Sequence, residues 1–393
     1  MDLKLISSEQ RPMLRFLIVH TAASVVGLQC WMILFNNFAV EIASLDGLQV
    51  GIIGSVREIP GLLALLVIFV MLVIREHRLS SLSIVFLGIG IALTGLFPSF
   101  LGLIITTLIM SFGFHYYETT NQSLTLQYFS TAVSPLIFGR LRSLAAATSI
   151  VVGLLIFLMG MVFSYKVMFL SIGSLVVAAG IWGLLQDPTH QQVVPQHRKM
   201  ILKRKYSLYY FLTFMAGARR QIFMAFSVYL LVKVFKCTVT EITLLFVANN
   251  AVNYVLSPLI GRAIVRFGER KVLSLEYASL ICVFLVYAFS GSKLIVITMY
   301  ILDHILFNFA IAIRTYFQKV ADPQDIAPSM AVGFTINHIA AVVIPAIGGA
   351  LWMVDYRIPF VAGAALSLIS LLAVQRIPRF IQLQKPAGDG PAS

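Results

Sequence analysis

The stretch YFLTFMAGARRQIFMAFSVYLL, residues 210–231, is apolar on both sides of two adjacent arginines, Arg219 and Arg220. A helix of about 20 apolar residues is long enough to cross a lipid bilayer. A charged side chain at the bilayer centre costs at least about 2.5–3.5 kcal/mol on insertion scales. Two arginines at this depth therefore indicate that the protein requires positive charge inside the membrane.

Other parts of the chain repeat this apolar pattern. Of its 393 residues, 59% are hydrophobic and 11% are charged, whereas about a quarter of the residues in a typical soluble domain are charged. Apolar runs that alternate with short polar breaks are typical of an all-α, multi-pass membrane protein. We expect twelve transmembrane spans, at about 14–40, 48–73, 80–97, 100–127, 138–163, 166–186, 207–235, 241–265, 272–290, 293–318, 327–354 and 357–375.

The basic residues orient these spans. We assign 20 of the 29 Lys and Arg residues to the tails and loops of one side, with Arg140 and Arg142 among them, five to the other side and four to span interiors. Loops rich in Lys and Arg stay in the cytoplasm, so both termini are expected there. The net charge of +13 then reflects these loops. Because no basic tract is interleaved with aromatic residues, we expect no nucleic-acid partner.

The long polar connection at residues 186–206 divides the chain into two halves that repeat. A tyrosine–phenylalanine pair at Tyr128 recurs 188 residues later at Tyr316. Parallel repeats of six spans are a transporter design in which the binding site lies near the membrane midplane. We expect an N-terminal six-helix bundle (1–186), a cytoplasmic central loop (187–206), a C-terminal six-helix bundle (207–376) and a cytoplasmic tail (377–393).

The loop after the eighth predicted span reads GRAIVRFGERK, residues 261–271. Its glycines and basic residues resemble the loop signature of the major facilitator superfamily (MFS), although Val265 and Glu269 depart from it. The resemblance to bacterial MFS transporters implies two pseudo-symmetric halves in the inner membrane that alternate access to a central site. It also implies a gating loop made of Gly261, Arg266, Gly268 and Arg270.

A second pattern of this superfamily bears on the substrate. Many of its proton-driven drug exporters carry a G-P-x-x-G-G signature in the fifth span, which the fifth predicted span here lacks. A partial match at Pro345, Gly348 and Gly349 lies in the eleventh span, where helix bending and close packing explain it. Proton-driven export of drugs or other amphipathic compounds is therefore an alternative function and not the favoured one.

The fourth predicted span has one polar face. Five polar residues recur there at spacings of 4, 3, 4 and 3, namely Ser111, His115, Glu118, Gln122 and Thr125. This spacing places them on one side of a helix. Either the face is a buried network that only orients the helix, or it handles protons and substrate, because ionisable groups inside a membrane are functional candidates by default. We favour proton coupling by Glu118 and His115.

Two further spans carry charged residues. The tenth has Asp303, His304 and Arg314. An isolated carboxylate in apolar surroundings takes up a proton, and a nearby arginine favours its release. This suits Asp303 and His304 to proton coupling, although a permanent structural pairing of Asp303 with an arginine is the alternative. In the second span, Arg57 either binds substrate or pairs with Glu58 to lock the extracellular half; Glu58 and Arg314 are predicted to be structural charges.

Adjacent residues on a helix point about 100° apart, which separates the two arginines of the opening stretch. The face through Arg220 includes Gly217 and Ser227 and is small and partly polar, whereas the face through Arg219 is bulky and apolar. We expect Arg220 to face the cavity, where a planar guanidinium can bind a carboxylate or phosphate. We expect Arg219 to be a structural charge held by a carboxylate or by carbonyl groups. Alternatively, both only bridge to acidic residues.

These patterns favour a secondary active transporter of a small anionic or zwitterionic organic solute, which works by proton-coupled symport and alternating access. No enzyme motif or P-loop is present. We expect no cofactor and no bound metal, with protons, the solute and the lipid bilayer as partners of a monomeric protein. A non-transporting membrane sensor is a second alternative. The expected substrate-binding residues are Arg57, Arg220, Asn249, Asn250, Asn253, Asn337 and His338.

Overall fold

The computed structural model of the protein describes residues 6–189, 194–197 and 199–382. The N-terminal half contains α1 (Arg11–Glu41), α2 (Gly47–Leu62), α3 (Val67–Val70), α4 (Glu76–Thr94), α5 (Phe100–Tyr128), α6 (Ser134–Gly160) and α7 (Tyr165–Leu184). The C-terminal half contains α8 (Ser207–Ile222), α9 (Val228–Lys233), α10 (Val239–Phe267), α11 (Glu269–Phe289), α12 (Lys293–Leu306), α13 (Ile311–Val320), α14 (Ile326–Val354), α15 (Arg357–Val374) and α16 (Ile377–Gln382). Parts of the expected central loop (190–193 and 198) and of the expected tail (383–393) lie outside the described residues.

These helices follow the twelve predicted spans and confirm an all-α membrane protein. In the part of the chain that the structure describes, eleven helical segments are long and apolar enough to cross a membrane. The exception is the predicted seventh span, where α8, one π-helical turn (Phe223–Ser227) and α9 follow one another. Helix α16 lies in the segment expected as a tail, where the sequence predicts no helix.

Polar side chains set the start of some helices. The carboxylate of Asp46 accepts a hydrogen bond from the backbone N–H of Gln49 at 2.8 Å at the start of α2. Thr238 accepts one from the backbone N–H of Glu241 at 3.2 Å at the start of α10. The first N–H groups of a helix have no partner within the helix, so these caps stabilise its first turn. Both caps lie in polar breaks between predicted spans.

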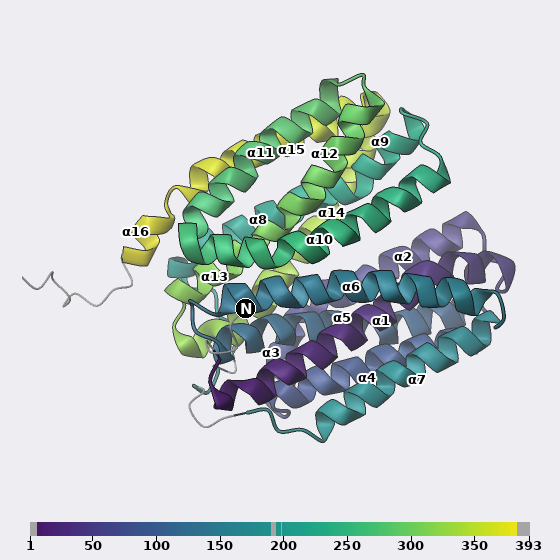
Figure 1. Cartoon of the computed structure of the whole chain (residues 1–393), viewed down its shortest axis with the longest axis horizontal. Coiled ribbons are helices and arrows are strands. Elements are labelled where there is room, and N and C mark those ends of the chain that lie inside the picture. Colours follow the sequence, from purple (N-terminus) through teal and green to yellow (C-terminus); the bar gives the residue numbers. More distant parts are fainter. Residues whose placement is uncertain (1–5, 190–193, 198, 383–393) are drawn as a thin grey trace, which may run out of the picture.

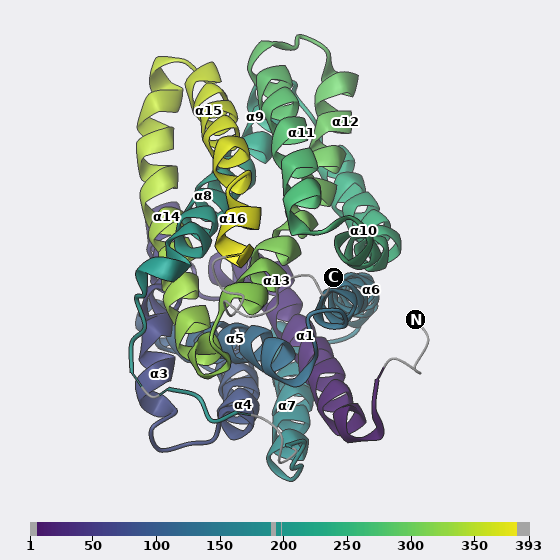
Figure 2. The same ribbon diagram turned by 90° about the vertical axis from the view of Figure 1, so that its left-hand side faces the viewer.

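The two halves form two bundles, α1–α7 and α8–α16, which lie side by side (Figure 1). They meet at the end where α13 lies beside α5 and α6, as the view onto that end shows (Figure 2). There Gln318 of α13 donates hydrogen bonds to the carbonyl oxygens of Leu126 at 2.6 Å and Phe129 at 2.7 Å. From this end, α6 and α10 diverge toward the opposite one (Figure 1). The bundles are therefore joined mainly at the end where α1 begins and α16 lies.

Three of the twelve spans are interrupted helices. A 3-10 turn at Leu63–Leu66 separates α2 from α3, and another at Phe307–Ala310 separates α12 from α13. The π-helical turn after α8 is the third interruption. Irregular backbone at membrane depth is tolerated where it is packed in protein or lines a cavity, and π turns are frequent at functional sites. These three spans also carry the arginines that the sequence places in span interiors.

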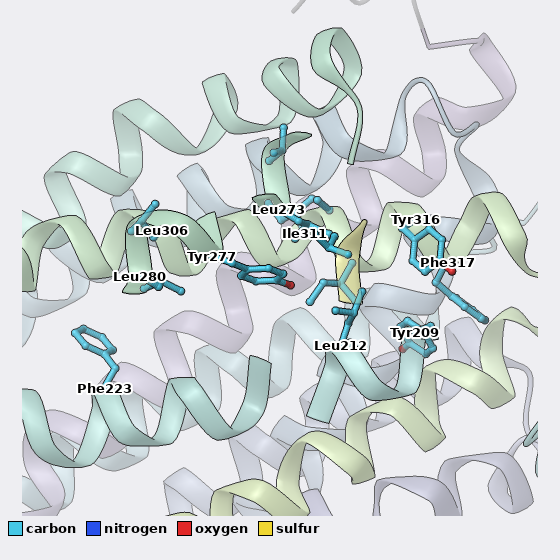
Figure 3. Close-up of a cluster of buried hydrophobic side chains, with 14 of the residues drawn as sticks. Tyr209, Leu212, Phe223, Leu273, Tyr277, Leu280, Leu306, Ile311, Tyr316 and Phe317 are labelled. Atoms are coloured by element: carbon cyan, nitrogen blue, oxygen red, sulfur yellow. The ribbon is translucent and has the colours of Figure 1, made fainter. Parts of the chain in front are cut away.

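An aromatic and aliphatic core holds the C-terminal bundle together (Figure 3). The rings of Tyr209 and Phe317 stack with their centroids 4.2 Å apart, which joins α8 to α13. Tyr277 of α11 lies in the same core, fully buried, between Leu280 and Ile311 (Figure 3). Burial of such large side chains adds many van der Waals contacts between the helices.

The segment before α8 is tied to the connection between α13 and α14. The ammonium of Lys203 donates to Asp325 at 2.5 Å and to Asp322 at 3.0 Å. The hydrogen bond to Asp325 raises the pKa of Lys203. Lys205 donates to Asp322 at 2.6 Å. The end of the expected central loop is thus anchored to the C-terminal bundle.

Candidate functional site

Two arginines from opposite halves approach one aromatic ring. The guanidinium carbon of Arg142 in α6 lies 5.4 Å from the ring centroid of Phe307, and that of Arg220 in α8 lies 5.0 Å from it. Cations at this distance are attracted to an aromatic face. Phe307 begins the turn between α12 and α13. The interrupted tenth span therefore presents an aromatic ring between the halves.

A third arginine and one carboxylate complete this group. The guanidinium carbon of Arg314 in α13 lies 5.6 Å from the ring centroid of Phe138 in α6. Glu118 of α5 interacts electrostatically with Arg142, Arg220 and Arg314. None of the three arginines forms a salt bridge with a carboxylate among the described residues. We call these four residues the central arginine cluster; it carries three positive charges against one carboxylate.

The central arginine cluster is reachable by solvent. Arg142 is exposed, while Arg220, Arg314 and Glu118 are half-buried. The carboxylate of Glu118 accepts a long hydrogen bond of 3.4 Å from Gln122, one turn further along α5. Guanidinium groups that are accessible but not neutralised can bind an anionic ligand.

Two asparagines, Asn308 and Asn253, extend the cluster into α10. The Nε of Arg142 donates to Oδ1 of Asn308 at 2.8 Å, and Nδ2 of Asn308 donates to Oδ1 of Asn253 at 2.6 Å. One turn earlier, both amide atoms of buried Asn249 lack a hydrogen-bond partner in the described part of the chain. Asn250 donates to the carbonyl oxygen of Phe246 at 3.0 Å. Of the three asparagines predicted in α10, Asn253 is the one linked to the cluster.

Arg219 has a different environment. Its side chain is 3% exposed, and its Nη2 lies 3.8 Å from Oε1 of the equally buried Glu276 in α11. Its guanidinium carbon lies 4.3 Å from the ring centroid of Tyr277, and its Nη1 donates to Ser370 of α15. Asp303, which is 4% exposed, belongs to the same bundle interior and interacts electrostatically with Arg219. This geometry supports a structural role for Arg219 and places Asp303 away from the central arginine cluster.

A third group of predicted residues lies where α14 meets the N-terminal half. Nη2 of Arg57 forms a salt bridge of 2.8 Å with Glu58, and its guanidinium lies over the ring of Trp31 at 5.3 Å. The rings of His115 in α5 and His338 in α14 approach with their centroids 4.8 Å apart. The structure therefore brings together residues that the sequence assigns separately to substrate, proton and structural roles.

The remaining predicted side chains are dispersed. Asn337 donates to the carbonyl oxygen of Thr213 at 3.4 Å, which joins α14 to α8. His304 packs with its ring centroid 5.7 Å from that of Phe223, and its Nδ1 has no hydrogen-bond partner among the residues described. Their predicted roles in substrate binding and proton coupling remain predictions.

The predicted gating loop is mostly helix. Gly261 lies inside α10, where α10 crosses α6, and a Cβ at this position would meet the carbonyl oxygen of Pro135 at 2.5 Å. Close approach of helices in membranes favours such small residues. Arg266 stacks over Phe267 at 5.2 Å, Gly268 follows α10 with a φ of 80°, and Arg270 is exposed.

Sequence reasoning missed Arg142 and Phe307. Arg140 and Arg142 are assigned to a loop from the sequence, but both belong to α6, which corrects that assignment; the basic excess of their side persists. The signal was present, because both fall inside the predicted span at 138–163. Phe307 offered no signal, since aromatic residues are common in every span.

Comparison with known proteins agrees with this architecture. A model of the Major Facilitator Superfamily matches residues 19–302 and 209–393. The chain belongs to this superfamily. The predicted family and the twelve-helix MFS fold are therefore confirmed, and no curated protein sequence matches the chain.

Three solved structures illustrate the MFS fold of this protein. A bacterial homologue of the iron transporter ferroportin, in an outward-facing state, is 14% identical with a TM-score of 0.74, covering 93% of this chain and 99% of its own. The human organic anion transporter MFSD10 (TETRAN) is 11% identical with a TM-score of 0.73, and the match covers 94% of this chain and 100% of the transporter. The transporter FucP, in the outward conformation, is 13% identical with a TM-score of 0.70, and the match covers 95% of this chain and 98% of FucP. At these identities the similarity shows the fold alone.

Proposed function

We propose that this MFS protein is a secondary active transporter of a small organic anion or zwitterion, which binds at the central arginine cluster. The observation that carries the proposal is the accessible excess of guanidinium groups around Phe307. A planar guanidinium binds a carboxylate or phosphate through two parallel hydrogen bonds. Arg142 belongs to one half and Arg220 to the other, so a bound anion would contact both halves. Alternating access around a midplane site requires such shared contacts.

Glu118 is the residue that we propose for proton coupling. It interacts electrostatically with all three arginines of the cluster. An anionic solute held by the same arginines would repel the Glu118 carboxylate and favour its protonated form. Solute and proton would then bind together, as symport requires. Asp303 lacks this geometric link to the cluster.

The proposal includes the membrane location, the domain division and the oligomeric state of the protein. The excess of basic residues at the end where the bundles meet favours a cytoplasmic location of both termini in a bacterial inner membrane. The division into bundles at 1–186 and 207–376 and a monomeric state belong to the same proposal.

Transport by the purified protein tests this function. Proteoliposomes with an imposed pH gradient are offered a mixture of anionic, zwitterionic, neutral and cationic metabolites, and their contents are read by mass spectrometry. We expect enrichment of anionic or zwitterionic solutes, which disappears when the gradient is collapsed. Movement of cationic amphipathic compounds alone would favour the drug-exporter alternative. Absence of any flux would favour the non-transporting sensor.

A further inference from the structure

Three side chains that can bind a metal ion converge where the halves touch. They are Glu58 of α2, His115 of α5 and His338 of α14, and one ligating atom from each lies within 4.8 Å of the other two. Glu58 is half-buried, and both histidines are buried. No other group of three or more potential metal ligands converges in this way within the described residues.

The hydrogen bonds of both histidines favour a free lone pair on Nε2, one of the two imidazole nitrogens that can bind a metal. Nδ1 of His115 lies 2.9 Å from the carbonyl oxygen of Ser111, and Nδ1 of His338 lies 2.9 Å from that of Phe334. Oγ of Ser111 also lies 3.0 Å from Nδ1 of His115, but it donates its proton to the carbonyl oxygen of Arg57. Because carbonyl oxygens only accept hydrogen bonds, we assign the proton to each Nδ1 and the free lone pair to each Nε2. Histidines that ligate metals almost always donate their other N–H in this way.

The surroundings of the histidines leave those lone pairs available. Neither Nε2 forms a hydrogen bond within the described part of the chain. The ring of Phe334 stacks on His338 with centroids 4.6 Å apart and meets His115 edge-on at 6.0 Å. This aromatic contact restricts both imidazole rings and limits the access of water to them.

Gly61 allows His338 to reach the N-terminal half. A Cβ at Gly61 would overlap the imidazole ring, with Nε2 of His338 only 2.6 Å away. Nearby, the hydroxyl of Thr335 accepts a hydrogen bond from the backbone N–H of Leu65 at 2.9 Å. Two contacts therefore bring α14 against the interrupted second span.

We propose that Glu58, His115 and His338 bind one divalent transition-metal ion that bridges the two halves. Two imidazole nitrogens and one carboxylate oxygen suit Zn²⁺, Fe²⁺, Co²⁺ or Mn²⁺, with remaining positions open to water or a ligand. This reverses the expectation from the sequence that the protein has no metal site. The inference stands independently of the proposed anion transport.

Ion binding would also tighten the contact between the halves. Ligand bonds of about 2.0–2.1 Å in tetrahedral zinc place ligand atoms about 3.3 Å apart. The three atoms lie within 4.8 Å of one another, so any pair that is farther apart than about 3.3 Å must come closer on zinc binding. Because His338 lies on α14 and the other two ligands lie on α2 and α5, the ion would hold α14 against the N-terminal half.

Arg57 competes with a metal ion for Glu58. It holds Oε1 of Glu58 through Nε at 3.1 Å and Nη2 at 2.8 Å, while Oε2 of Glu58 forms no hydrogen bond among the described residues. Its positive charge opposes a nearby divalent cation. Arg57→Gln should therefore strengthen metal binding several-fold, and unchanged or weaker binding would contradict ligation by Glu58.

Metal titration of the purified, tag-free protein tests the site. With Co²⁺, we expect one ion per chain and a visible absorption spectrum of nitrogen and oxygen ligation, and Zn²⁺ should displace the Co²⁺. His115→Gln and His338→Gln should each weaken binding by more than about tenfold. Zn²⁺ should raise the melting temperature of the wild-type protein but not that of either variant.

His20→Gln is a matched control. Nδ1 of His20 also lies 2.9 Å from a carbonyl oxygen one turn earlier, that of Phe16, but its Nε2 is already bonded to Ser81 at 3.2 Å. This variant should bind metal like the wild type. Absence of the Co²⁺ spectrum in the wild type would overturn the proposal even if the variants fail to fold. Equal binding by the His115→Gln/His338→Gln double variant would also overturn it, since the ion would then lie elsewhere.

Discussion

Arg219 and Arg220 are neighbours in the chain, yet they belong to two different regions of the molecule. Arg219 points into the C-terminal bundle, where it is 3% exposed and lies 3.8 Å from Glu276. Arg220 points between the bundles, where it is half-buried and shares the ring of Phe307 with Arg142. The first arginine faces a carboxylate, and the second faces other cations.

Under the proposed function, this difference assigns stability to one arginine and ligand binding to its neighbour. A buried charge must be compensated within the protein, because its desolvation costs several kcal/mol. A charge in an accessible space keeps part of its hydration and stays available to a ligand. The two arginines therefore differ in their partners and in their exposure to solvent. Their position along the span is nearly the same and does not distinguish them.

The largest effect is expected inside the bundle. Arg219→Ala should lower the free energy of unfolding by about 3–5 kcal/mol, because it leaves Glu276 buried without its cation. Detergent melting temperature and the yield of monodisperse protein measure this loss. An Arg219→Met/Glu276→Gln double variant should recover part of the stability. An Arg219→Ala protein that melts like the wild type would remove the distinction between the two regions.

The next effect concerns solute binding between the bundles. Arg220→Ala should weaken solute affinity roughly tenfold to hundredfold, since a charge-assisted hydrogen bond contributes about 1.5–3 kcal/mol. Arg220→Lys should also impair binding, because an ammonium lacks the planar fork. Affinity is measured with the solute identified in proteoliposomes, and Arg262→Ala on the exposed side of α10 is the control. If Arg220→Ala binds solute with normal affinity and Arg219→Ala is stable but cannot bind, then Arg219 binds the solute and Arg220 is structural.

A third expectation separates binding from proton coupling. Coupling to one proton across a one-unit pH gradient supports at most about tenfold accumulation, or about 1.4 kcal/mol. Glu118→Gln should abolish this accumulation and spare the exchange of solute for solute, because it cannot release a proton. Uptake and counterflow in proteoliposomes distinguish the two. If Asp303→Asn loses accumulation and Glu118→Gln does not, coupling lies in the region of Arg219 instead.

The smallest effect is expected at the surface. Lys205 and Asp322 are 2.6 Å apart, with side chains 33% and 45% exposed. Exposed ion pairs typically contribute less than about 1 kcal/mol, so Lys205→Ala should change the melting temperature little. A destabilisation as large as that of Arg219→Ala would show that exposure does not decide the strength of charge pairs in this protein.

Much of the candidate site could be predicted, because helical periodicity indicates on which face of a helix each side chain lies. The 4-3 spacing from Ser111 to Thr125 predicts one polar face on α5, and the structure joins Glu118 to Gln122 along it. The 100° between Arg219 and Arg220 predicts their divergence. Arg142 was missed because a basic residue near the start of an apolar run was assigned to a loop.

The sequence by itself determined the twelve spans and the superfamily, because hydropathy, helical period and the loop signature are local properties of the chain. Only the tertiary structure decided which charged and polar side chains meet. Arg142 and Arg220 share Phe307 across the halves, and Glu58, His115 and His338 converge from three helices. Such partners are far apart in the chain. No local sequence pattern determines the angle at which two helices cross or the distance between the side chains that meet there.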